Sequence, residues 1–415
     1  MCECSTKSAP KKTPYPEKKH TLKEFFDLYW NRYLESPKQH IKPEHFKAVN
    51  AIRLCRTDAL GKDIYACTAC GDTVELLHNC KNRFCPTCSW KDTLKWGERM
   101  QNMLMNVPHR HVVFTLPHSL NSLIRLNQKD LTNALMSISG HLITDYLLKE
   151  HGIKAGVIAV LHTFGEKKNL HVHVYMIVSW GGERVCDNGL KVMSNPYVKY
   201  DELKERFKNG YIKVLSRLYK KKELVHRFAS NTDFENFINK LKTHKWILHF
   251  EDPMKIPTQV ITYIGRYSKR ACISEYKILD ISQDHITFSY KDYKDKDDNG
   301  KIVEKELRLH YSEFIPLLLQ HVPLPYFRLV RYYGAYNALS GVNKRHLFVK
   351  RDSKATGDPE PASQVQDQTD TIYCRSCKSN MLYIASEVNR KGINWQTYKK
   401  LELLKRHETK EKNVA

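Results

Sequence analysis

The sequence predicts an α+β fold in which helices are inserted among antiparallel strands. Segments with apolar residues at helical spacing are interleaved with short apolar runs that are rich in β-branched residues. Two of these runs are separated by only five residues, as in a β-hairpin. At 415 residues, the chain is also long enough for two or three domains with hydrophobic cores. This order of elements favours an α+β core.

The N-terminal part is predicted to be helical and rich in cysteine. Residues 1–20 are polar, with many Lys and Pro, and are expected to be a disordered basic tail. Apolar spacing predicts helices over Thr21–Glu35 and from Pro43 to about Arg53. A short, polar, cysteine-rich stretch covers residues 65–88. Ser89 is the expected N-cap of a helix that continues to Met105 and is stopped by Pro108.

The middle of the chain is predicted to hold most of the strands. The run His111–Leu116 is typical of a central strand, and Asp130–Lys149 of a helix that stops at Gly152. A hairpin is expected to join strands Gly156–Phe164 and Leu170–Val178. Basic amphipathic helices Asp201–Glu223 and Asp233–His244, a strand Trp246–Phe250 and a helix Thr258–Ala271 follow.

The remaining elements are a second hairpin, a helix and a linker. The strands Ile286–Tyr290 and Val303–Leu309 flank a charged turn, and Ser312 caps a helix through Gln320. Residues 351–371 are rich in Asp, Ser, Gln and Pro, which is typical of a linker. The expected divisions of the chain are residues 1–20, 21–106, 107–275, 276–350 and 351–415.

Charge indicates a polyanionic partner. The chain has 68 Lys and Arg against 45 Asp and Glu, a formal charge of +23 that is spread along its length. Nucleic acid is the first candidate. An anionic membrane is the rival, but there is no apolar run long enough to span a bilayer and no secretion signal in Met1–Lys19. We therefore expect a cytoplasmic protein, associated with a prokaryotic nucleoid, whose twelve cysteines serve metal binding more than disulfides.

Two Cys-x2-Cys knuckles predict structural zinc. Cys67, Cys70, Cys85 and Cys88 offer four thiolates for one tetrahedral Zn²⁺. Cys80 is a fifth thiol, and His78 and Cys55 lie nearby. One of these three is an alternative ligand or belongs to a second site. Basic residues surround the knuckles and predict phosphate contact, namely Lys81, Arg83, Lys91 and Lys95.

A third Cys-x2-Cys lies near the C-terminus. Cys374 and Cys377 form half of a zinc site and need partners from elsewhere in the chain. The sequence leaves open whether they bind metal. Cys186 and Cys272 are expected to be ordinary thiols.

A histidine pair predicts a catalytic cation. Residues i and i+2 of a strand project from the same face, so His171 and His173 are expected side by side. Two imidazoles in this position can share a divalent cation, Mg²⁺ or Mn²⁺. A third ligand is expected from His162 on the preceding strand or from Gln259. The alternative is that these histidines are ordinary residues of a half-buried strand and bind no metal.

A basic helix with two tyrosines supplies the expected nucleophiles. Tyr263 and Tyr267 are four residues apart and share a helix face. A phenol has a pKa near ~10 and attacks poorly by itself. A metal that polarises a phosphate, with Arg266, Lys269 and Arg270 nearby, makes attack feasible. The expected product is a phosphotyrosine that conserves bond energy for strand joining. Tyrosines that merely pack the helix on the sheet are the alternative.

The order of these motifs closely resembles the two-tyrosine HUH transposases of the insertion-sequence-ninety-one family, rolling-circle elements related to Helitrons. The resemblance covers about residues 45 to 380. Its motifs are Cys67-x2-Cys70, the Cys80–Cys88 run, His111–Pro117, His171-Val172-His173, Tyr263–Arg270, and the late segment His321–Pro323 to Arg331–Gly334. One departure is Asn169-Leu170, where relatives often have a proline before the first histidine.

The resemblance implies an N-terminal zinc-binding domain, an HUH endonuclease core with a central antiparallel sheet, and a C-terminal extension. It implies single-stranded DNA of element ends and target as the substrate. It also implies that His171 and His173 are metal ligands, that Tyr263 and Tyr267 are nucleophiles, and that 107–275 is the catalytic region.

Three functions compete at this stage. A transposase that nicks and rejoins element ends is favoured over a plasmid replication initiator or relaxase with the same chemistry. A non-enzymatic zinc-finger DNA-binding protein explains the charge and the cysteines but not the histidine pair. The sequence does not decide the oligomeric state, so a homo-oligomer stays open, and it does not show which tyrosine acts first.

Overall fold

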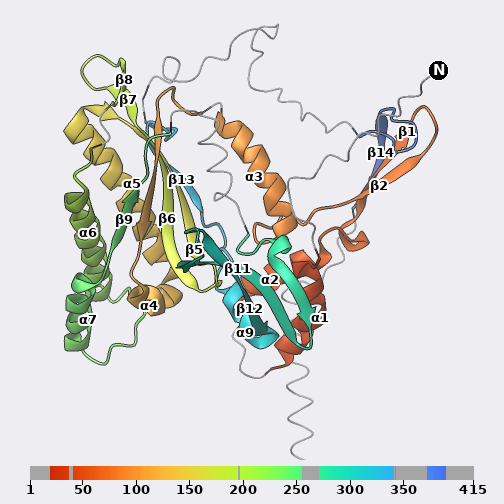
Figure 1. Cartoon of the computed structure of the whole chain (residues 1–415), viewed down its shortest axis with the longest axis horizontal. Coiled ribbons are helices and arrows are strands. Elements are labelled where there is room, and N and C mark those ends of the chain that lie inside the picture. Colours follow the sequence, from red (N-terminus) through yellow and green to blue (C-terminus); the bar gives the residue numbers. More distant parts are fainter. Residues whose placement is uncertain are drawn as a thin grey trace, which may run out of the picture.

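A computed structural model describes residues 19–36, 41–101, 103–194, 197–254, 271–340, 342 and 372–388. Its centre is a five-stranded sheet of order β13-β5-β6-β3-β9 in which every neighbouring pair is antiparallel (Figure 1). The strands are β3 (His109–Thr115), β5 (Gly156–Phe164), β6 (Leu170–Ser179), β9 (Ile247–Phe250) and β13 (Val330–Gly334). The predicted α+β fold with a central antiparallel sheet is therefore confirmed.

Helices cover one face of this sheet. Strand alternation directs Val172, Val174 and Met176 of β6 into the main hydrophobic core, where they meet the buried faces of the helices. These helices are α4 (Asn121–Leu126), α5 (Gln128–His151), α6 (Tyr200–Lys220) and α7 (Asn231–Thr243). The predicted stop of α5 at Gly152 is confirmed, since this residue adopts the left-handed conformation at φ +65°.

The opposite face of the sheet is covered in part by α3 (Pro86–Gln101). Trp96 and Met100 of this helix share a smaller core with Ile158 and Ile177 of the sheet. The predicted start at Ser89 is wrong, because Pro86 occupies the first helical position, where its missing N–H costs nothing. The Ser89 hydroxyl instead donates to the Pro86 carbonyl at 3.1 Å.

The N-terminal helices pack against a segment from late in the chain. Phe25 of α1 (Leu22–Glu35) meets Phe314 of α9 (Tyr311–Leu319) with ring centroids 5.2 Å apart. One buried core joins α1 and α2 (Pro43–Leu54) to α9 and to a three-stranded sheet. Its strands are β10 (Ile278–Ser282), β11 (His285–Lys296) and β12 (Ile302–His310). The separation of residues 21–106 and 276–350 into different parts of the chain stays a prediction. In the structure, helices of the first part and elements of the second share this one core.

A third sheet projects from the body of the molecule (Figure 1). It has the order β14-β1-β2, with β1 (Lys62–Cys67), β2 (Thr73–Leu77) and β14 (Met381–Glu387). The remaining short elements are η1 (Asp58–Leu60), η2 (His118–Leu120), η3 (Glu275–Lys277), β4 (Ile153–Lys154), β7 (Gly181–Arg184) and β8 (Leu190–Val192). No helix in the described ranges is long and apolar enough to cross a membrane.

Candidate active site and metal centres

The histidine pair lies on the sheet face opposite α5 and α6. His171 and His173 project side by side from β6, with ring centroids 5.0 Å apart, while the intervening Val172 is buried in the core beneath. This is the geometry that the strand period predicts. Tyr175 continues the same row, and its ring meets His173 edge to face at 4.7 Å.

His162 lies directly across from the pair. It is the register partner of His173 on the neighbouring strand β5, and the two ring centroids are 5.5 Å apart. His118, in the turn after β3, stacks on His171 with ring centroids 5.1 Å apart, a neighbour that the sequence analysis did not predict. That contact depends on strand pairing between β3 and β6, which local sequence does not reveal.

One hydrogen bond orients the buried histidine of the pair. Nδ1 of His173 lies 2.9 Å from the backbone oxygen of His171, so it donates a proton to that carbonyl. In the neutral ring, Nε2 then carries the lone pair that a metal needs. Burial lowers the pKa of His173 well below its usual value, with the neighbouring His162 and His171 adding to the effect. Burial also lowers the pKa of His171, so both rings are favoured in the neutral, metal-binding form.

The segment predicted to be a helix with the two nucleophilic tyrosines lies outside the described residues. Gln259, Tyr263, Arg266, Tyr267, Lys269 and Arg270 all fall within 255–270. Before this gap, Met254 pairs with His109, the first residue of β3. After it, Ala271 and Cys272 line a cavity of about 200 Å³ together with His162. Ala271, the first described residue after this gap, therefore lies at the same cavity as His162.

Arg83 lines the same cavity. Its guanidinium donates to the carbonyl of Phe327 at 3.2 Å, and Arg328 is a second cation in the lining. The cavity thus lies between the cysteine-rich region and the central sheet. Its two guanidinium groups fit a phosphate-bearing ligand.

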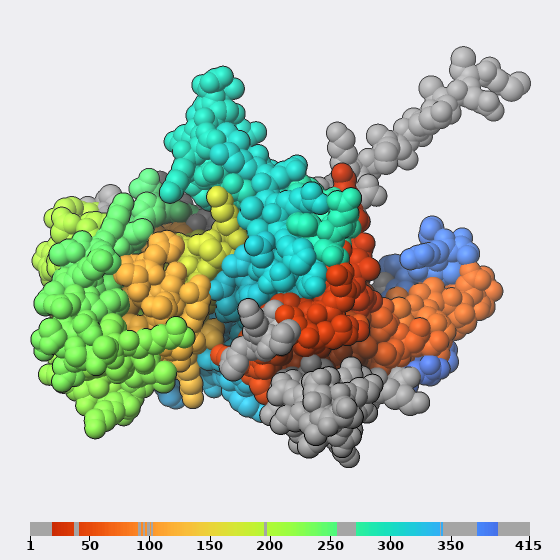
Figure 2. Space-filling view, turned by 90° about the horizontal axis from the view of Figure 1, so that it is seen from below, coloured from red at the N-terminus to blue at the C-terminus, as the bar shows by residue number. Residues whose placement is uncertain are grey.

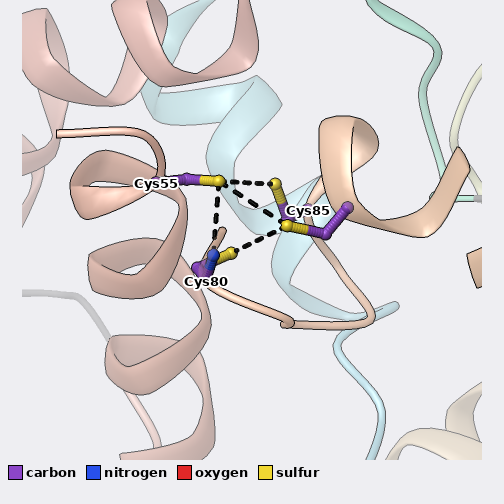
Figure 3. A group of neighbouring side chains, drawn as sticks. Cys55, Cys80 and Cys85 are labelled. Atoms are coloured by element: carbon purple, nitrogen blue, oxygen red, sulfur yellow. Dashed lines mark hydrogen bonds between the residues drawn. The ribbon is translucent and has the colours of Figure 1, made fainter. Parts of the chain in front are cut away.

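Four cysteine sulfurs converge where α2 ends and α3 begins. Cys55, Cys80, Cys85 and Cys88 place all their Sγ atoms within 4.8 Å of one another. Figure 3 labels three of them, Cys55, Cys80 and Cys85, whose side chains point toward one another. The Cys80–Cys88 distance is 3.5 Å, and the Cys55–Cys88 distance is 3.6 Å. A tetrahedron with Zn–S bonds of ~2.3 Å requires sulfurs about 3.8 Å apart. Hydrogen bonds with Cys80 and Cys85 lower the pKa of Cys55 to about 7.

The expectation of one zinc held by Cys67, Cys70, Cys85 and Cys88 is wrong in its grouping. Cys67 and Cys70 lie at the tip of the β1–β2 hairpin, whereas Cys55 and Cys80 flank its base. The length of the hairpin keeps the two knuckles apart. Cys55 and Cys80, both named in the sequence analysis as alternatives, take the places of Cys67 and Cys70.

His78 serves a structural contact instead. Its Nε2 lies 2.9 Å from a carboxylate oxygen of Asp63, and its Nδ1 lies 3.0 Å from the carbonyl of Leu60. The hydrogen bond with Asp63 raises the pKa of His78. Both ring nitrogens are therefore engaged at the base of the hairpin, with Asp63 of β1 and with Leu60 just before it.

Comparisons with known proteins bear on both regions. Residues 156–344 match a family model described as "Putative transposase", and residues 25–116 match one described as "Transposase zinc-binding domain". The cysteine cluster falls in the second match and the histidine pair in the first. No solved structure matches the chain.

Two curated proteins are similar over most of their length. The "Transposase for insertion sequence element IS801" of Pseudomonas savastanoi pv. phaseolicola is 26% identical over 405 residues, covering 93% of this chain and 94% of that protein. The "Putative transposase y4qJ" of Sinorhizobium fredii is 29% identical over 303 residues, covering 69% of this chain and 73% of that protein.

Proposed function

Because this chain is a transposase of the insertion-sequence-ninety-one family with an N-terminal zinc-binding domain, we propose that it nicks and rejoins single-stranded DNA at element ends through a 5′-phosphotyrosine intermediate. The observation that carries this proposal is the group of His162, His171 and His173 on one face of an antiparallel sheet, beside a cavity that Arg83 and Arg328 also line. The family membership favours this reading over a replication initiator and over a non-enzymatic zinc-finger protein.

The proposed reaction is a transesterification. The phenol oxygen of Tyr263 or Tyr267 attacks a backbone phosphorus, and a P–O bond to tyrosine forms as the bond to the 3′ oxygen breaks. The phenol proton is released, and the 3′ oxygen leaves as a hydroxyl after taking up a proton. Attack by a 3′ hydroxyl on the phosphotyrosine reverses the step and joins two strands. No external energy source is required, because one phosphodiester replaces another.

The histidine face fits a divalent cation. His171 and His173 would hold it through ring nitrogens, with His162 or Gln259 as the third protein ligand. Among the described residues, three histidine nitrogens do not converge as closely as the cysteine sulfurs do. A bound Mg²⁺ or Mn²⁺ supplies Lewis acidity toward the phosphate oxygens. Arg266, Lys269 and Arg270 are proposed to hold the DNA backbone, with Arg83 contributing from the cavity wall.

The structural zinc is proposed to bind Cys55, Cys80, Cys85 and Cys88. Cys55 follows the end of α2, Cys80 follows β2, and Cys85 and Cys88 lie at the start of α3. One ion would therefore hold these three elements together. Three of the four cysteines are buried in the core that joins the N-terminal helices to α9.

A covalent-adduct assay tests the proposed reaction. Purified protein is incubated with labelled single-stranded element ends and Mg²⁺ or Mn²⁺, then resolved on a denaturing gel. A labelled band at the mass of protein plus DNA supports the phosphotyrosine. Cleavage with both DNA products free of protein contradicts it.

A further inference from the structure

A second group of four cysteines joins the two ends of the chain. Cys67 and Cys70 lie at the tip of the β1–β2 hairpin, and Cys374 and Cys377 lie just before β14. Their four Sγ atoms are all within 4.8 Å of one another. The Cys67–Cys377 distance is 3.4 Å, and the Cys70–Cys374 distance is 3.6 Å. These distances are far longer than the ~2.05 Å of a disulfide and close to the edge of a zinc–thiolate tetrahedron.

The two Cys-x2-Cys turns have the same backbone geometry. In the first, the N–H of Cys67 donates to the carbonyl of Asp72 at 2.8 Å, and the N–H of Gly71 donates back to Cys67 at 3.0 Å. In the second, the N–H of Cys374 donates to Ser379 at 2.8 Å, and that of Lys378 donates back to Cys374 at 3.0 Å.

Both turns also place a left-handed residue directly after the second cysteine. Gly71 has φ +81° and Lys378 has φ +64°. Gly adopts this conformation without strain, but a lysine adopts it at a cost. Two equivalent knuckles that face each other are the arrangement of a four-cysteine zinc ribbon.

The small sheet around these cysteines has little else to stabilise it. β14 pairs with β1 from Lys62↔Glu387 to Cys67↔Met381, and the ring of Tyr65 meets that of Tyr383 at 5.6 Å. The buried core of this sheet consists of only Cys67, Cys374 and Met381 among the described residues. A core of this size supplies too little hydrophobic free energy to hold three strands together, so such units depend on a metal or disulfides.

The sheet also stands apart from the catalytic core. In Figure 2 the orange β1–β2 hairpin and the blue segment 372–388 lie side by side at one end of the molecule, far from the green helices α6 and α7. Residues 372–388 fall outside both matched family regions, 25–116 and 156–344. The N-terminal knuckle is therefore completed by a segment about three hundred residues away in sequence.

We propose that Cys67, Cys70, Cys374 and Cys377 bind a second Zn²⁺, which fastens the C-terminal segment to the N-terminal hairpin. The cysteines lose their thiol protons on binding, and the ion keeps its oxidation state, so no oxidant or reductant is involved. This site is independent of the proposed strand-transfer chemistry. Its failure would leave that chemistry untouched.

Zinc stoichiometry of the full chain tests the site. Native mass spectrometry of the reduced, purified protein is expected to show two zinc ions per chain. The Cys374→Ser/Cys377→Ser variant is expected to show one, as is Cys67→Ser/Cys70→Ser. Cys186→Ser is the matched control, because this exposed thiol belongs to neither cluster, and it is expected to keep two.

Three outcomes would overturn the proposal. They are a single zinc in the wild-type chain, two zinc ions in the Cys374→Ser/Cys377→Ser variant, and a mass four units low for zinc-free protein purified without reductant, which indicates two disulfides. Cobalt substitution distinguishes the loss of one metal site from misfolding of the whole variant. The thiolate-to-cobalt absorbance of Cys374→Ser/Cys377→Ser should fall to about half of wild type, with the first cluster still filled.

Discussion

The ring of His173 is held in place by the backbone of His171, whose carbonyl accepts a 2.9 Å hydrogen bond from Nδ1. Only Val172 separates the two residues, so this hydrogen bond forms within β6 and involves no other element of the fold. It fixes the tautomer that leaves Nε2 available, as carbonyl contacts do at many metal-bound histidines. The strand itself therefore orients the His173 ring and leaves the lone pair of its Nε2 available.

Removing either histidine should abolish DNA cleavage and spare DNA binding. His171→Ala and His173→Ala each delete one proposed ligand, whereas binding depends on a basic surface that neither change touches. Cleavage of labelled single-stranded DNA and its gel-shift affinity measure the two effects separately. His226→Ala, on an exposed loop, is the control and should retain cleavage. Wild-type cleavage by either mutant in the presence of chelator would refute the metal site.

Loss of one cysteine from the first cluster should destabilise the helical N-terminal region. Cys55→Ser removes a buried ligand that lies in the core shared by α1, α2 and α9. Structural zinc contributes directly to folding, so the thermal midpoint should fall and one zinc should be lost. Differential scanning fluorimetry and metal analysis check this. An unchanged midpoint and unchanged zinc content would show that Cys55 is not a ligand.

The cysteines illustrate what a linear sequence can and cannot show. Their spacing correctly indicates zinc, but it does not reveal which knuckle joins which. The β1–β2 hairpin separates Cys67 from Cys85, although only a short loop and two strands divide them in sequence. Cys374 finds its partners through pairing of β14 with β1, a contact whose register no local pattern encodes.

A glycine of α5 is required by a tyrosine of the sheet. A Cβ added at Gly140 would lie 2.6 Å from the Tyr333 ring, and that ring is held by a 2.8 Å hydrogen bond from its hydroxyl to the Met136 carbonyl. We expect Gly140→Ala to lower the free energy of unfolding by about 1–3 kcal/mol through overpacking, despite the better helix propensity of Ala.

Gly210→Ala in α6 is the matched control for this substitution. Its added Cβ meets only a side-chain methyl of Ile138, at 3.3 Å. Urea denaturation should rank Gly140→Ala as the less stable of the two. The opposite ranking would mean that Tyr333 moves aside at little cost.

Stability should fall in acid because of a buried histidine. Burial lowers the pKa of His321 to about 4, while Nδ1 accepts from Thr163 at 3.0 Å and Nε2 donates to the Lys168 carbonyl at 2.9 Å. The unfolded chain, with a pKa of about 6.5, binds the proton more readily than the folded chain. The contribution is therefore complete above pH ~6.5 and is lost as the pH falls toward 4.

The size of this effect is about 3 kcal/mol, since each unit of pKa difference is worth about 1.4 kcal/mol. Denaturation midpoints measured across pH 4 to 7 for the wild type and His321→Gln provide the check. The variant should show a shallower pH slope than the wild type. Equal slopes would mean that His321 titrates normally in the folded protein.

The central strands were predictable for a simple physical reason. The apolar pattern and the two-residue repeat of side-chain direction in a strand can be read from the residues of that strand. β5, β6 and the side-by-side histidines therefore follow from local pattern alone. β13 was missed because Val330–Gly334 carries two tyrosines and an arginine and lacks a clear alternation. Its place at the edge beside β5 comes from tertiary packing of Tyr333 on α5.

The proposed nucleophiles give the most direct test of the account. Tyr263→Phe and Tyr267→Phe each keep the aromatic ring and delete one phenol oxygen, so folding and binding of single-stranded DNA should persist. Both single variants should fail in transposition, because each step of strand exchange uses a tyrosine. The decisive measurement is the covalent protein–DNA adduct formed with labelled element ends and Mg²⁺ or Mn²⁺. The account predicts an adduct for the wild type and none for the Tyr263→Phe/Tyr267→Phe double variant. An adduct formed by the double variant at the wild-type level would contradict it.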